Sequence, residues 1–203
     1  MLSLGLLTSS GCPPCRFVSF YSQEAKLSIV EDRYSDVNWA NELRKAYLTA
    51  VMSPDPSSQN GALVYNEHRH LIGQGFNGFT PGVEITPDKL ERPVKYLYIE
   101  HAERAAVYDC IGSSRYDRVP QGNEPVLMVC PWASCADCAR AIVLSGISLL
   151  VRHKDAMERK VDRWADSIAL ADKILIAGGV EIYEHVGPVD GPEIMHLEEK
   201  WTP

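Results

Sequence analysis

The chain has 203 residues, which is enough for one domain with a hydrophobic core and too few for two full enzyme domains. Hydrophobic residues make up 45% and charged residues 23% of it, as in an ordinary globular protein. The formal net charge of −7 argues against a large nucleic-acid interface, because such an interface needs many Lys and Arg side chains to neutralise phosphates. We therefore expect a small-molecule substrate.

The chain shows no sign of a membrane or secretory protein. No apolar run approaches the roughly 20 residues that span a bilayer, and residues 1–7 are too short and lack the basic flank of a signal peptide. We expect a cytoplasmic protein. Its six cysteines are then reduced thiols or metal ligands rather than a disulfide framework.

The first half of the chain alternates regular and irregular patterns. Residues 1–35 have no clean periodicity and are interpreted as an N-terminal extension of the domain. Residues 38–52 carry apolar side chains at helical spacing, and the prolines that follow end the helix. Residues 61–65 and 71–76 read as two strands of a hairpin. Residues 77–97 have the Gly and Pro content of a long structured loop.

The second half predicts alternating helices and strands. Helices are expected at about residues 101–110, 135–145 and 164–177, and strands at 125–130, 147–152 and 180–183. This order describes a single sheet with helices packed on both faces, an α/β fold. The domain is expected to cover residues 36–189, and residues 190–203 are interpreted as a C-terminal tail.

The strongest chemical signal is His101 and Glu103 followed by Cys135 and Cys138. One imidazole and two thiolates suit zinc and leave a fourth tetrahedral position for water, as in a catalytic zinc site. The two cysteines, three residues apart at a helix start, share one face there, and the helix N-terminus favours their thiolate forms. Glu103 is placed to move protons without binding the metal. The alternatives are a zinc knuckle or core thiols, with a buried structural histidine.

This pattern resembles that of the zinc-dependent nucleotide deaminases, His-x-Glu followed by Pro-Cys-x-x-Cys, in which the glutamate is the general acid and base. Ser134 stands where the pattern has proline. Three segments extend the likeness: SPDPSSQNGA at residues 53–62, GFNGFTPG at 75–82 and HAERAA at 101–106. Over residues 38–189 the chain is similar to the deoxycytidylate deaminase branch of the cytidine deaminase superfamily.

The resemblance implies a three-layer α/β/α sandwich with a five-stranded mixed sheet and one catalytic Zn²⁺ per chain. It implies hydrolytic deamination of dCMP to dUMP with release of ammonia. It also implies a homo-hexamer and regulation by dCTP, with Mg²⁺, and by dTTP. Asn77 is expected to contact the deoxyribose, and Ala102 and Ser134 the substrate. Gly75, Phe76, Asn77 and Gly78 would contribute to a regulatory nucleotide site, with the basic side chains Lys89, Arg92 and Lys95 as candidates for phosphate contacts.

Several alternatives stay open. Within enzymes these are deamination of cytidine, of dCTP or of tRNA adenosine; from a different class, a catalytically silent zinc or nucleotide-binding module. Cys12 and Cys15 have the spacing of a redox pair but lack the expected strand and helix around them. A second, structural zinc formed by these cysteines with His68 and His70 is a further hypothesis. Trp132 could line the base pocket or belong to the core.

Overall fold

The computed structural model describes residues 34–112, 126–159 and 164–203, so Cys12 and Cys15 lie outside the described residues. Its centre is a five-stranded mixed sheet in the order β2-β1-β5-β6-β7. The first three strands in that order pair antiparallel, and β5, β6 and β7 run parallel. The strands are β1 (Gly61–Tyr65), β2 (Leu71–Phe76), β5 (Val126–Val129), β6 (Ile147–His153) and β7 (Glu181–His185).

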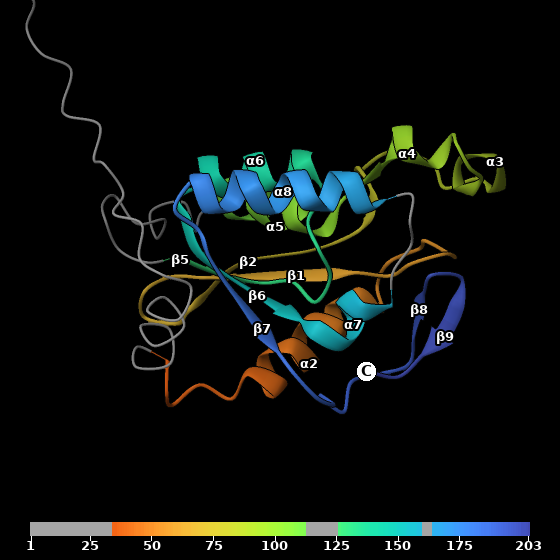
Figure 1. The fold of residues 1–203 in the computed structure, drawn as a ribbon. Coiled ribbons are helices and arrows are strands. Elements are labelled where there is room, and N and C mark those ends of the chain that lie inside the picture. The colour runs from red at the N-terminus through yellow and green to blue at the C-terminus, as the bar shows by residue number, and fades with distance from the viewer. Residues whose placement is uncertain (1–33, 113–125, 160–163) are drawn as a thin grey trace, which may run out of the picture.

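Helices cover both faces of this sheet (Figure 1), which confirms the three-layer α/β/α sandwich. Three helices lie on one face: α5 (Ala102–Gly112), α6 (Ala136–Leu144) and α8 (Ala165–Ala177). The other face carries α2 (Trp39–Ala50) and the short α7 (Lys154–Glu158), which the sequence did not predict. Within the described residues no helix is both long and apolar enough to cross a bilayer.

The central strands are buried on both sides, and their alternate residues supply two separate cores. In β5, Met128 packs into the core under α5, α6 and α8, whereas Leu127 and Val129 pack into the core under α2. This division follows from the two-residue period of a strand, whose successive side chains point to opposite faces. The same sheet therefore fixes helices on both sides, including the starts of α5 and α6.

The long segment between β2 and α5 is more regular than its composition indicates. It contains the two-stranded pair of β3 (Gly78–Phe79) with β4 (Ile99–Glu100), and the one-turn helices α3 (Pro87–Leu90) and α4 (Lys95–Tyr98). Elements of two to four residues lack the repeated period on which a sequence prediction depends. The pairing of β3 with β4 brings the two ends of the segment together, so the chain enters α5 next to the point where it left β2.

Residues 190–203, interpreted from the sequence as a tail, form a hairpin of β8 (Ile194–His196) and β9 (Glu199–Trp201). The hairpin is held to the loop that precedes β1. The Gln59 N–H donates to the Met195 carbonyl at 2.7 Å, and the Met195 N–H donates to Gln59 Oε1 at 2.9 Å. The C-terminal residues thus support a loop that leads into the sheet.

Candidate metal and active site

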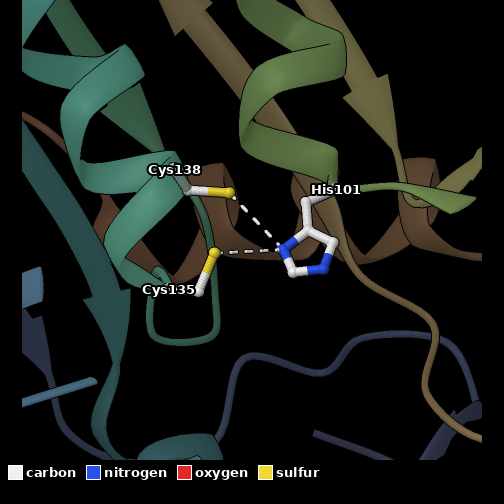
Figure 2. A group of neighbouring side chains, drawn as sticks. All are labelled: His101, Cys135 and Cys138. Atoms are coloured by element: carbon white, nitrogen blue, oxygen red, sulfur yellow. Dashed lines mark hydrogen bonds between the residues drawn. The ribbon is translucent and has the colours of Figure 1, made fainter. Parts of the chain in front are cut away.

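His101, Cys135 and Cys138 come together at the N-terminal ends of α5 and α6 (Figure 2). The Nδ1 atom of His101 lies 3.5 Å from Cys135 Sγ and 3.4 Å from Cys138 Sγ. The three potential ligand atoms all lie within 4.8 Å of one another, and this is the one such cluster of three or more His, Cys, Asp or Glu side chains among the described residues. The structure therefore brings together the three residues expected to bind the metal.

Local backbone geometry places the two sulfurs side by side. Cys135 is the N-cap of α6 with extended backbone, φ −78° and ψ 171°, and its carbonyl accepts from the Ala139 N–H as the helix begins. Cys138 follows in the first turn, so the spacing of three residues puts both side chains on one face. The Ala136 N–H donates to Ser167 Oγ at 3.2 Å, which ties this helix start to α8.

The sulfurs are electrostatically coupled. A hydrogen bond shared with Cys138, and a second from His101, lower the pKa of Cys135 to about 3. The same hydrogen bond, together with burial, raises the pKa of Cys138. The two sulfurs thus oppose each other's ionisation, and a cation bound between them would stabilise both thiolates.

Arg104 is the neighbouring cation, and sequence reasoning missed it. It forms an ion pair with Glu100, and a guanidinium nitrogen lies 3.8 Å from the Asp137 carboxylate. Glu100 also accepts a hydrogen bond from the His101 N–H at 2.8 Å, so this network spans the starts of both helices. The positive charge of Arg104 opposes the rise in the pKa of Cys138.

The donor set fits zinc. One imidazole nitrogen and two sulfurs are preferred zinc ligands, and three protein ligands leave a tetrahedral position open for water or substrate. A structural zinc site would be closed by a fourth protein ligand. In the part of the chain that the structure describes, the cluster has three members, which is the arrangement of a catalytic centre.

Glu103 lies in the first turn of α5 and is only 2% exposed, yet it is not part of the ligand cluster. Burial raises the pKa of its carboxyl group, and the positive charge of His101 opposes this rise. A buried carboxyl group that lines the same pocket as a metal cluster is suited to exchange protons with a bound substrate.

His101 and Cys135 line a pocket that also contains aromatic, apolar, polar and charged residues. Trp132, Trp164 and Ala102 belong to its lining, and the ring of Trp164 lies 6.4 Å from that of His101. Ser134 lies buried at 1% exposure next to Cys135 but is not in the lining. Besides His101 and Glu103, the polar and charged residues of the lining are Asp55, Ser58, Asn60, Asn77, Arg92 and Lys95.

Asn77 reaches this pocket, but its side chain already holds the loop before β1. Its Oδ1 accepts from the Asn60 N–H at 2.7 Å, and its Nδ2 donates to the Ser58 carbonyl at 2.7 Å. A contact with the deoxyribose therefore stays a prediction, and it would use the remaining lone pair of Oδ1. The structure adds a positioning role that the motif did not indicate.

Two glycines of the same motif, Gly75 and Gly78, leave little space for a side chain. A Cβ atom on Gly75 would lie 2.4 Å from the Ala106 nitrogen, so β2 and α5 pack there without a side chain between them. A Cβ atom on Gly78 would lie 2.9 Å from the Phe76 ring. Close packing against the backbone of α5 thus accounts for Gly75, whereas at Gly78 the Phe76 ring would have to shift. The regulatory nucleotide site assigned to residues 75–78 stays a prediction.

The three basic residues of the following segment are placed differently from one another. Lys89 is partly exposed and donates to the Glu84 carbonyl at 2.7 Å. Arg92 and Lys95 line the pocket, and Lys95 is buried in an ion pair. The hairpin histidines His68 and His70 have ring centroids 6.1 Å apart. A second zinc involving them stays a prediction, because its cysteines lie outside the described residues.

Comparison with known proteins agrees with this geometry. Residues 38–154 match the family described as the cytidine and deoxycytidylate deaminase zinc-binding region. An uncharacterised deaminase from the luxG 3′ region of Aliivibrio fischeri is 32% identical over 145 residues, which cover 71% of this chain and 91% of that protein. The deoxycytidylate deaminase of Mus musculus is 32% identical over 118 residues, or 54% of this chain and 61% of the mouse protein.

A solved structure shows the same fold. The dCMP deaminase of the cyanophage S-TIM5, crystallised with dCMP and dUMP, superposes with a TM-score of 0.53 at 20% identity, covering 71% of this chain and 93% of that one. The family match includes His101, Glu103, Cys135 and Cys138, and the donor set fits the zinc named in its description. The chain belongs to the cytidine and deoxycytidylate deaminase family of zinc-binding hydrolytic deaminases.

Proposed function

We propose that the protein deaminates dCMP to dUMP, with water as co-substrate and ammonia as the second product. The observation that carries this proposal is the buried Glu103 carboxyl group, which lines one pocket with His101 and Cys135. A zinc knuckle or a silent binding module has no need of a buried carboxyl group beside the metal. A hydrolytic deaminase needs one to move protons between water, the ring nitrogen and the leaving amine.

His101, Cys135 and Cys138 would hold the zinc ion, which when bound supplies a water molecule that is nucleophilic at neutral pH. Glu103 would accept a proton from the attacking water, whose oxygen adds to C4 of the cytosine ring. The carboxyl group then donates the proton to N3 and assists protonation of the departing ammonia. Its raised pKa suits this role, because the group must bind and release a proton within one turnover.

The pocket walls support a pyrimidine nucleotide. Trp132 and Trp164 offer aromatic surfaces in the pocket, on which a planar base would stack. Arg92 lines the same pocket and would bind a 5′-phosphate. The names of the mouse and human relatives, both deoxycytidylate deaminases, support the choice of a deoxynucleotide monophosphate.

Substrate profiling tests the proposal. The zinc-loaded protein is incubated with dCMP, dCTP, deoxycytidine, CMP and cytidine, and both the loss of cytosine absorbance and the release of ammonia are measured. We expect dCMP to give the highest kcat/KM. A higher kcat/KM for dCTP or cytidine would mean that this compound, and not dCMP, is the substrate. Release of no ammonia from any of the five compounds would support the silent binding module.

The proposal also covers the regulation and the oligomeric state of the enzyme. We propose a homo-hexamer in which dCTP with Mg²⁺ lowers the KM for dCMP and dTTP raises it. An effector acts only by binding two states with different affinities, so the test is the initial rate against dCMP concentration with each triphosphate. Superimposable curves would exclude regulation, and sedimentation would give the oligomer size. Zinc content above one per chain would support the second, structural site.

A further inference from the structure

Two cations from the segment before α5 line the pocket, and a carboxylate neutralises each of them. Lys95 Nζ lies 2.9 and 3.0 Å from the two carboxylate oxygens of Asp55. Arg92 forms its ion pair with Glu198, at the tip of the C-terminal hairpin. A substrate phosphate that binds in this pocket must therefore compete with a carboxylate of the protein itself.

The two ion pairs differ in how easily they can open. The side chains of Lys95 and Asp55 are 5% and 7% exposed, and Asp55 also accepts the Ser57 N–H at 2.8 Å. Opening this pair would leave buried charges without partners, which is strongly unfavourable. The side chains of Arg92 and Glu198 are 33% and 58% exposed, so water can solvate both when they separate. Arg92 is thus the exchangeable cation.

The backbone conformation of a tight turn fixes the position of Glu198. Leu197 and Glu198 form the two-residue turn between β8 and β9, with φ values of 55° and 73°. Such a turn favours Asn and Gly, because other residues are strained at positive φ. Hydrogen bonds fix the turn: the Leu197 N–H donates to Ser58 Oγ at 3.1 Å, and the Glu198 N–H donates to the Ser57 carbonyl at 2.7 Å.

We propose that Glu198 is a built-in competitor for the substrate phosphate: it occupies Arg92 in the free enzyme and is displaced when a 5′-phosphate binds there. This inference rests on the proposed function and assigns its phosphate-binding residue. A phosphate monoester and a carboxylate can each bind a guanidinium through two oxygens, but the phosphate carries more negative charge, which favours displacement of Glu198. The cost of opening the pair appears in the KM for phosphorylated substrates.

The neighbouring Glu199 provides a matched control. It lies on the same hairpin and pairs with Arg159 at 3.3 Å, and neither residue lines the pocket. Glu198→Gln and Glu199→Gln remove the same charge one residue apart. A general effect of protein charge on anion binding would change both variants equally, whereas a local competitor changes only the first.

The experiment measures kcat/KM for dCMP and for deoxycytidine in the zinc-loaded wild type and both variants. We expect the ratio of the two values to rise about two- to fivefold in Glu198→Gln, as for release of a partly exposed ion pair, and to stay at the wild-type value in Glu199→Gln. In an Arg92→Gln background the Glu198→Gln substitution should no longer raise the ratio. An unchanged ratio in Glu198→Gln, or equal changes in the two variants, would overturn the proposal.

Calorimetric titration with inorganic phosphate, at fixed ionic strength, separates this inference from the proposed function. We expect phosphate to bind Glu198→Gln more tightly than the wild type or Glu199→Gln, and to bind Arg92→Gln more weakly. That pattern would support the competitor even if the wild type failed to deaminate dCMP. Equal phosphate affinity in all four proteins would overturn the competitor even if dCMP proved to be the substrate.

Discussion

Asn60 and Asn77 form a reciprocal pair. The Asn77 Oδ1 accepts the Asn60 N–H at 2.7 Å, and the Asn77 N–H donates to the Asn60 carbonyl at 3.1 Å. The Asn60 side chain in turn donates to Cys130 Sγ at 3.3 Å, at the end of β5. Both asparagines line the pocket. The wall that faces the substrate is thus joined to the central sheet by side-chain hydrogen bonds.

Replacing Asn77 by alanine should therefore reduce stability as well as substrate binding. The substitution leaves the partly buried Asn60 N–H and Ser58 carbonyl without their partner, which costs about 1 to 3 kcal/mol of the free energy of unfolding. Urea denaturation measures this cost, and the KM for the substrate should rise in parallel. Asn41→Ala, on the exposed face of α2, is the control. If Asn77→Ala raised KM with wild-type stability, the role would be contact with substrate alone.

Glu103→Gln should keep zinc and fold but lose turnover. The amide has nearly the same shape as the carboxyl group, and Glu103 lies outside the ligand cluster, so metal binding has no reason to fail. Loss of general acid–base catalysis should lower kcat by about a hundred- to ten-thousandfold. Zinc per chain and circular dichroism serve as controls for the fold. A kcat close to that of the wild type would refute the proton-transfer role.

Cys135→Ser and Cys138→Ser should each lose zinc, and the activity of each variant should be below about 1% of the wild-type value. Removing one thiolate from a site with three protein ligands weakens zinc binding severely. Cys110→Ala is the matched control, because Cys110 is a buried cysteine of α5 outside the cluster. We expect it to retain zinc. The measurement is elemental analysis of the purified variants. Full zinc occupancy in both serine variants would mean that the metal binds elsewhere.

The sequence predicted those features that short-range rules determine. The α2 helix begins at Trp39 because Asn38 caps it, its side chain accepting the Asn41 N–H, and the Ser-Pro sequence ends it. The metal ligands were predictable because a spacing of three residues at a helix start places Cys135 and Cys138 on one face. In each of these cases a few residues that are close in the sequence determine the feature.

Features that depend on contacts between distant segments were not predictable. Lys95 was expected to be a basic loop residue, yet it is buried against Asp55, 40 residues earlier. Nothing near Glu198 in the sequence indicates its contact with Arg92, 106 residues away. Such contacts exist only once the sheet and the C-terminal hairpin have brought these segments together, so periodicity and spacing cannot report them.

Two buried histidines, His153 and His196, belong to an aromatic group that includes the pocket residue Trp132. His196 packs its ring on Trp132, with centroids 5.1 Å apart, and on Trp201, also at 5.1 Å. His153 stacks on Trp201, with ring centroids 5.9 Å apart. Its ring donates to the Gly187 carbonyl, so its other nitrogen accepts from the Tyr47 hydroxyl at 2.8 Å, as in a neutral imidazole. Trp132 is thus both a pocket residue and part of a buried aromatic group.

These histidines should make the protein less stable as the pH falls. Burial lowers the pKa of His196 to about 4, and it also lowers the pKa of His153. The unfolded chain binds a proton near its ordinary pKa of 6.5, whereas folded His196 stays neutral until about pH 4. The stability is therefore fully present above pH 6.5 and is lost as the pH falls from there toward 4.

The prediction is that His196 alone lowers the free energy of unfolding by about 2 kcal/mol between about pH 7.5 and about pH 5. His196→Phe keeps an aromatic ring against Trp132 and Trp201 but cannot titrate, so its stability should fall by about 2 kcal/mol less over the same interval. The difference between the two proteins, measured by urea denaturation at each pH, cancels the other groups that titrate in both, the zinc ligands included. Parallel pH profiles for wild type and variant would show that His196 is protonated in the folded protein, contrary to its burial.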